Sequence, residues 1–302
     1  MHWFKGAHYD FISVRRRVMA VSMAFILAGL VSMALHRGYN LSIDFTGGTL
    51  IEVDFGTTVP LQDVRRIVER AGFAGAEITT IGSPSDVMIK VKHIGEAAEG
   101  ARRIEATLKE QLAGHTVDVR RVESVGPKIG RELRMAAFWA ILYSFAGIVA
   151  YVAWRFNFRS GVAGVLALVH DVLFTLGFLS ITNREISISV IAALLTLVGY
   201  SINDTIVVYD RIRENLQTRR REGLAHVVNV SINQTLSRTI ITSLTVLFSL
   251  IVLILFAGPV IRDFALTLFV GIIVGTYSSV FIASPIVVEW DLWSNRHRKR
   301  VK

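Results

Sequence analysis

One carboxylate, Asp204, stands inside a long apolar stretch at residues 186–209. Burying a charge at the centre of a membrane helix costs about 2.5–3.5 kcal/mol on insertion scales, and such residues usually serve ion or proton movement. At 100° per residue, a helix would place five other residues within the same arc of roughly 140°. We expect this polar stripe to face the interior of a helix bundle. Its other members are Thr196, Gly199, Tyr200, Asn203 and Asp210.

The stripe has two interpretations. Asn203 is well explained as a hydrogen-bonding contact between helices. Asp204 is not, because an ionised carboxylate needs a cation or a proton. Arg238, just before the next apolar stretch, is the expected counter-ion, and such a pair could load and release a proton as it forms and breaks. Arg238 could equally well be an anchor whose side chain reaches the membrane surface.

His170 and Asp171 form a second ionisable pair within residues 161–181. Histidine titrates near neutral pH, which suits a proton relay. A polar contact between helices, or with a neighbouring chain, explains the pair slightly better. His170 with Ser201 is also the one candidate for the nucleophile and base of an intramembrane enzyme. We expect no catalysis, no cofactor and no metal, and the lack of cysteine excludes thiolate zinc and iron–sulfur clusters.

The elements that must position these residues are membrane helices. The 302 residues are 52% hydrophobic, and six stretches reach the length that a bilayer span needs. The net charge of +9 first suggests nucleic acid. Because Arg and Lys gather at the ends of the apolar stretches, a lipid bilayer explains them better, and we expect no nucleic-acid partner. The six predicted spans are residues 18–37, 135–154, 161–181, 186–209, 239–257 and 264–288.

Short basic loops set the expected orientation. Arg and Lys gather at residues 15–17, 155–159, 211–221 and 296–302, which lie on one side of a six-span protein. The positive-inside rule places both ends, 1–17 and 289–302, in the cytoplasm and residues 38–134 outside. A cleaved signal peptide is the alternative for the first span, but its apolar run is too long. In the loop at 210–238, residues 224–237 would lie along the membrane or extend the fifth span, and periodicity does not decide.

Residues 38–134 have the pattern of one small folded domain. Apolar and charged residues alternate at 51–55, near 77–81 and at 87–91, and again around 117–119, which is typical of half-buried strands. Helical periodicity follows Pro60 and recurs from Ile104 to Leu112. The predicted order βαββαβ is the ferredoxin-like arrangement, which carries no function by itself. Gly47 and Gly48 precede the first strand, either as an ordinary turn or as a hinge.

Several of these segments resemble the SecD/SecF family of protein-export membrane subunits, within the RND superfamily. Residues 44–49, Asp-Phe-Thr-Gly-Gly-Thr, resemble a motif shared by SecD and SecF. Residues 125–130, 199–215 and 231–239 match the SecF branch, and the resemblance covers almost the whole chain. His170 and Asp171 resemble a recurring pair in the third span of the family.

The resemblance implies one half of a twelve-span assembly in the bacterial inner membrane, with SecD as the other half. Family members associate with the SecYEG channel, and the accessory proteins YajC and YidC are further expected partners. Together they help pull preproteins outward with the proton-motive force. The residues that match Asp204 and Arg238 belong to the family's proton pathway, with an aspartate from SecD. An RND-like exporter of small molecules or lipids is the alternative, and a pure scaffold is a third. Since carboxylates bind both protons and sodium ions, the driving ion stays open.

Overall fold

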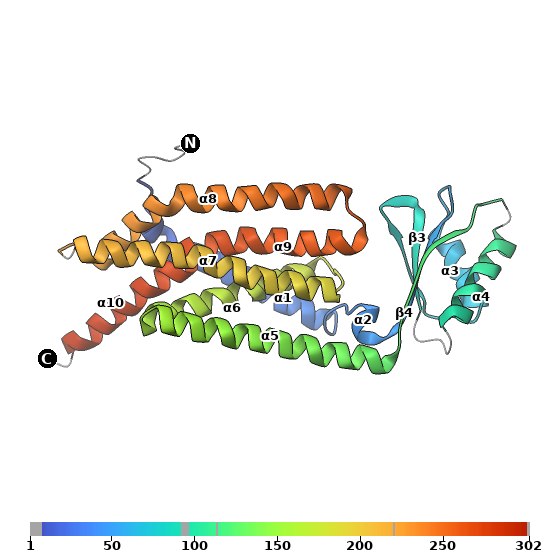
Figure 1. The fold of residues 1–302 in the computed structure, drawn as a ribbon, viewed down its shortest axis with the longest axis horizontal. Helices are drawn as coiled ribbons and strands as arrows, with labels where there is room; N and C mark the ends of the chain where they lie inside the picture. The colour runs from blue at the N-terminus through green and yellow to red at the C-terminus, as the bar shows by residue number, and fades with distance from the viewer. Residues whose placement is uncertain (1–7, 92–96, 113, 220, 301–302) are drawn as a thin grey trace. The chain divides into compact units, whose positions relative to one another are not determined.

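The computed structural model describes residues 8–91, 97–112, 114–219 and 221–300, and it divides into two compact units (Figure 1). The sheet unit comprises Leu41–Ala140 and Glu185–Ile188. The helical unit comprises the described parts of residues 1–40, 141–184 and 189–302.

Six helical stretches in the described chain are long and apolar enough to cross a membrane, as predicted. The sixth is formed by α9 and α10 with a short π-helical segment between them. The helices are α1 (Phe11–Leu35), α5 (Pro127–Arg155), α6 (Phe158–Ile181), α7 (Ile188–Thr218), α8 (Leu224–Phe256), α9 (Pro259–Ser278) and α10 (Ser284–Arg300).

The continuous helix α8 decides between the two interpretations of residues 224–237, which extend the fifth span. At 1.5 Å per residue its 33 residues span about 50 Å, more than the roughly 30 Å hydrocarbon core. The helix is therefore longer than one bilayer span requires. In its first turns, the side-chain oxygens of Asn233 and Asn229 accept from the main-chain N–H groups of Tyr9 and Phe11, and both amides donate to the carbonyl of Tyr9, at 2.9–3.0 Å.

Close packing joins the helices of this unit. Helix α1 packs against α6, α6 against α9, and α8 runs beside α9 (Figure 1). Two glycines allow the contact between α1 and α6. A Cβ atom built on Gly29 of α1 would lie 2.4 Å from the Cα atom of Gly177 in α6. The two backbones therefore touch directly at this crossing, which is the usual role of small residues between membrane helices.

The π-helical segment Ser279–Ala283 interrupts the sixth span. Pro285 follows it, and proline lacks the N–H that would continue an α-helical ladder. The N–H of Ser284 bonds the carbonyl of Ser279, five residues back. The hydroxyl of Tyr209 in α7 donates to the carbonyl of Ala283 at 3.1 Å. Such single-turn widenings have an identifiable cause and often mark functional sites.

The sheet unit has four antiparallel strands in the order β2-β3-β1-β4. Its elements follow the predicted order βαββαβ, and α3 and α4 cover one face of the sheet (Figure 1). Ile51 and Val53 point from β1 into a core that α3 and α4 complete with Val64 and Ile104. The last strand is longer than its prediction. The elements are α2 (Ile43–Thr46), β1 (Gly48–Asp54), α3 (Leu61–Arg70), β2 (Glu77–Ile81), β3 (Ser83–Val91), α4 (Ala97–Gln111) and β4 (Asp118–Val125).

Candidate functional site

Asp204 is buried in α7, with 2% of its surface exposed. Its Oδ2 accepts a hydrogen bond of 3.5 Å from Ser243 in α8, and the Ser243 hydroxyl meets that of Thr276 in α9 at 2.7 Å. The carboxylate therefore contacts α8 directly and α9 through the hydroxyl of Ser243. One turn before it, the hydroxyl of Tyr200 donates to the main-chain oxygen of Thr242 at 2.9 Å.

A cavity of about 280 Å³ lies beside this group, between α1, α8 and the sixth span. Its walls are mostly apolar, but Ser243 and Thr276 line it together with Thr239. The buried hydroxyl of Thr239 has no hydrogen-bond partner among the described residues. Since an unpaired buried hydroxyl is costly and water needs polar partners, this wall suits a water molecule near Asp204.

The predicted polar stripe does not face the interior of this chain as a whole. Thr196, Gly199 and Asn203 are exposed on the helical unit, Tyr200 is half-buried, and only Asp204 is buried. Periodicity correctly groups the residues on one arc of α7, but it cannot tell which side neighbouring helices cover. The side of α7 that the neighbouring helices cover carries Leu197 and Ser201 instead.

Arg238 is exposed in α8, and no ion pair within 4.0 Å joins it to Asp204 among the described residues. The two residues are thus not in contact in this conformation. Asp210, the last residue of the stripe, forms an ion pair with a different residue, because Arg155 lies 2.7 Å from its Oδ1. The roles predicted for Asp204 and Arg238 stay predictions.

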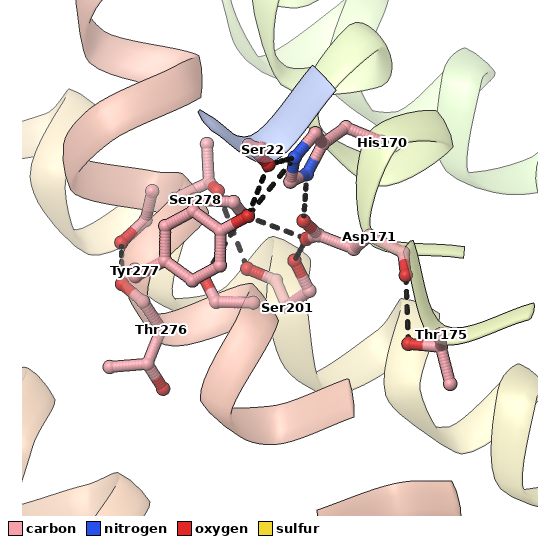
Figure 2. A network of polar contacts seen from close by, with 11 residues as sticks. Ser22, His170, Asp171, Thr175, Ser201, Thr276, Tyr277 and Ser278 are labelled. Atoms are coloured by element: carbon pink, nitrogen blue, oxygen red, sulfur yellow. Dashed lines mark hydrogen bonds and ion pairs between the residues drawn. The ribbon is translucent and has the colours of Figure 1, made fainter. Parts of the chain in front are cut away.

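A second polar group surrounds His170 and Asp171 of α6 (Figure 2). The imidazole Nδ1 lies 2.9 Å from Asp171 Oδ1. Ser201 of α7 and Ser278 of α9 donate to Asp171 Oδ2 at 2.5 and 2.8 Å. The other ring nitrogen, Nε2, contacts the hydroxyls of Ser22 in α1 and Tyr277 in α9. The pair therefore makes the interhelical contacts that the sequence suggested.

The intramembrane-enzyme hypothesis paired Ser201 with His170, and the structure does not place them so. Ser201 bonds Asp171, while Ser22 occupies the position next to the imidazole Nε2. Ser22 was missed because a serine in an apolar helix gives no distinctive signal. It is 4% exposed, so a substrate carbonyl has no access to its hydroxyl in this conformation. Within the described part of the chain, no group of three or more His, Cys, Asp or Glu could hold a metal.

The paired glycines of the sheet unit form a tight turn against a second motif. Gly47 and Gly48 have φ angles of 73° and 145°, a region that favours glycine. A Cβ atom on Gly47 would lie 3.2 Å from the Cα atom of Pro127, and one on Gly48 would lie 2.8 Å from the carbonyl oxygen of Val91. Gly130 approaches Gly47 in turn. Packing and backbone angle explain both glycines here, and the hinge stays a prediction.

The remaining two motifs meet between α7 and α8. The amide of Asn215 donates to Ser231 and to Gln234, each at 2.8 Å. Arg211 also donates to Gln234, at 2.6 Å. These contacts join residues 199–215 to residues 231–239, so the long specific motifs are explained in part by one helix–helix contact.

Known families and proteins match almost the whole chain. Residues 104–293 match the family described as "Protein export membrane protein SecD/SecF, C-terminal", and residues 35–59 match the "SecD/SecF GG Motif". The protein translocase subunit SecF of Desulfurispirillum indicum is 43% identical over 289 residues, covering 94% of this chain and 92% of that protein. The SecF of Magnetococcus marinus is 44% identical over 298 residues, covering 97% and 96%.

Longer proteins match as well. The protein translocase subunit SecDF of Thermus thermophilus is 43% identical over 296 residues, which are 95% of this chain but 39% of that protein. The crystal structure of SecDF from the same organism, titled a translocon-associated membrane protein, superposes with a TM-score of 0.88 at 41% identity. The superposition covers 96% of this chain and 40% of the SecDF chain.

Proposed function

Because the chain belongs to the SecD/SecF family of protein export membrane proteins, we propose that it couples the proton-motive force to late steps of preprotein export. The coupling would run through a proton bound by Asp204. The family confirms the resemblance drawn from the motifs and gives the chain an accessory role in Sec protein translocation as a multi-pass membrane protein.

The observation that carries this proposal is the burial of Asp204 without a cation in contact. A carboxylate at the middle of a membrane helix requires a proton or a positive partner. Its hydrogen-bond donor is the hydroxyl of Ser243, which in turn contacts the hydroxyl of Thr276. Hydroxyl groups can donate to a carboxylate and can accept from a carboxylic acid, so this surrounding tolerates both states. In this proposal Arg238 supplies the positive charge in another stage of the cycle.

The exposed side of α7 supports a partner at this site. Thr196, Gly199 and Asn203 lie on the surface of the helical unit beside Asp204, where lipid would leave the side-chain amide of Asn203 unpaired. In the proposal, a SecD half covers this side and supplies its own aspartate. The SecDF relative agrees with this, because the part that resembles our chain makes up about two fifths of it.

The remaining expectations extend the same proposal. The chain would lie in the bacterial inner membrane with both ends in the cytoplasm and residues 38–134 in the periplasm. SecYEG, YajC and YidC would be its further partners, and the exported preprotein its load. Moving one charge through the transmembrane potential provides about 2.3 kcal/mol per 100 mV, which is enough to shift a two-state bundle. The curated relatives named here are translocase subunits, so the exporter of small molecules or lipids is not proposed.

The test is the variant Asp204→Asn, reconstituted with SecD and SecYEG while proton and sodium gradients are set separately. Asparagine keeps the size and the hydrogen bond to Ser243 but cannot take up the proton. We expect normal assembly and loss of the gradient-driven stimulation of export. The gradient that stimulates the wild-type complex identifies the driving ion.

Asp210→Asn is the matched control. It makes the same chemical change in the same helix, at a carboxylate that has Arg155 beside it. We expect this variant to keep the stimulation. Full stimulation in Asp204→Asn would contradict the proposal.

A further inference from the structure

The His170–Asp171 group is more than one contact between two helices. It draws together four helices (Figure 2). Its members on α1, α6 and α7 lie near the middle of their helices, and Tyr277 and Ser278, at the end of α9, lie near the middle of the sixth span. Asp171 is 1% exposed and His170 is 7% exposed. Two ionisable side chains side by side at such a depth are expensive, and a simple packing role could be filled by hydroxyls or amides.

The carboxylate of Asp171 is fully supplied with donors. Its Oδ1 meets the imidazole Nδ1, and its Oδ2 accepts from Ser201 and Ser278. An ionised carboxylate only accepts hydrogen bonds, so this arrangement satisfies it without any further group. Thr175 lies next to this site but is not one of its donors, because its hydroxyl donates to the main-chain oxygen of Asp171 at 2.8 Å and not to the carboxylate.

The imidazole can hold or release a proton without losing its partners. Its Nε2 contacts the hydroxyls of Ser22 and Tyr277, and these two oxygens lie 2.5 Å from each other. A neutral Nε2 accepts from one hydroxyl while the other hydroxyl donates to the first. A protonated Nε2 donates to them instead, because a hydroxyl both donates and accepts. In both states each of these three atoms keeps a hydrogen-bond partner within the group, so the contacts do not restrict the imidazole to one state.

The imidazole of His170 is the neighbouring group that can balance the negative charge of Asp171. Among the ion pairs of the described residues, Asp171 takes part in the one with His170. The neighbours that face the pair are Ser22 from α1, Ser201 from α7, and Tyr277 and Ser278 from α9, and of these only Tyr277 is titratable. With one shared proton the pair is neutral, and without it the pair carries one negative charge. Such a proton belongs to the pair rather than to either residue.

Short links join this pair to the site of Asp204. Ser201 and Asp204 lie three residues apart on α7, which places them on neighbouring turns of one face. On α9, Thr276 bonds Ser243 of the Asp204 group, and the next two residues belong to the His170–Asp171 group. The π-helical segment begins directly after them, at Ser279.

We propose that His170 and Asp171 form a second proton-binding site, and that its occupancy is coupled to Asp204 through Thr276, Tyr277 and Ser278 of α9. This site deepens the proposed function, but its proton binding does not depend on export. A proton that arrives or leaves here changes the charge at the crossing of α1, α6, α7 and α9. The widened turn after Ser278 is the place where α9 can adjust to that change.

Infrared difference spectra between two pH values test the proton binding in the full chain, reconstituted in lipid vesicles. The comparison is made in the Asp204→Asn background, so that Asp204 contributes nothing. Adding Asp171→Asn should remove a carboxyl or imidazolium band, and adding His170→Gln should remove or shift the same band. The control Thr175→Val, which removes a neighbouring buried hydroxyl, should leave that band in place.

Identical difference spectra for Asp204→Asn with and without Asp171→Asn would overturn the proposed proton binding. If the Asp171 variant does not fold, the same comparison is made with His170→Gln.

The coupling is tested by export in the otherwise wild-type chain. Asp171→Asn should lose the gradient-driven stimulation, whereas Thr175→Val should keep it. Stimulation that survives Asp171→Asn but not Asp204→Asn would overturn the coupling alone, and survival in both would overturn the proposed function instead.

Discussion

The side chain of Asp44 accepts a hydrogen bond of 3.0 Å from the main-chain N–H of Ile188. Ile188 begins α7, and the first N–H groups of a helix have no partner within it. Beside this bond, the N–H of Ser42 donates to the carbonyl of Ile186 at 3.0 Å. The segment that carries the paired glycines therefore holds the start of the helix that carries Asp204.

Asp44→Ala should destabilise this connection by about 1 kcal/mol, the usual cost of removing the side chain that caps a helix start. Asp44→Asn keeps an acceptor oxygen and should cost only a few tenths of that amount. Unfolding of the full chain in detergent, followed by helix content, measures both. Equal stability of the alanine variant and the wild type would show that water replaces the cap. If the connection also transmits motion, the alanine variant should weaken export stimulation more than the asparagine variant.

Gly29→Ala should disturb the crossing of α1 and α6. The new methyl group would lie 2.4 Å from the Cα atom of Gly177, which is backbone and cannot rotate away. Overpacking of this kind usually costs about 1–3 kcal/mol. The measurement is again unfolding in detergent.

The control for this variant is Gly147→Ala in the exposed part of α5, where a Cβ atom meets nothing within 4 Å. Alanine favours a helix over glycine, so this variant should be as stable as the wild type or more stable. If both alanine variants behave alike, the contact at Gly29 is not tight.

Asp54 should make the sheet unit sensitive to acid. The pKa of Asp54 is lowered from 3.8, mainly because the N–H of Gly56 donates to it at 2.8 Å and also because Arg120 lies beside it. Since the folded pKa lies below the unfolded one, the carboxylate adds stability above pH 3.8. This contribution is lost as the pH falls through the folded pKa.

Denaturation at a series of pH values measures this effect in the full chain, with a fluorophore on Thr79→Cys in the sheet unit. Asp54→Asn should flatten the loss of stability between the two pKa values. Arg120→Gln should flatten it only partly, because the bond from Gly56 remains. An unchanged acid profile in Asp54→Asn would assign the sensitivity to other carboxylates.

Hydrophobic patterning predicted the six spans and the order βαββαβ, because burial imposes a period on each element. The burial of Asp204 followed from the same reasoning. Patterning failed where the answer depends on what lies beside a helix. It could not show that Asn203 faces away from the chain, or that Ser22 meets the imidazole of His170.

Contacts between segments that are far apart in the sequence could not be predicted either. Asp44 and Ile188 are 144 positions apart, and no local preference joins them. Residues 224–237 are a related case, since their pattern fits a surface helix as well as an extension of α8. The tertiary contacts of Asn229 and Asn233 with the N-terminal segment belong only to the folded chain.

The proposed orientation can be tested with single cysteines, because the natural sequence contains none. Thr79 is exposed in β2 and Thr218 is exposed at the end of α7. In intact spheroplasts, a thiol reagent that cannot cross membranes should label Thr79→Cys and spare Thr218→Cys, because the basic loop after α7 should face the cytoplasm. Inverted vesicles should give the opposite result. Labelling of Thr218→Cys from outside would reverse the orientation and contradict the periplasmic placement of residues 38–134.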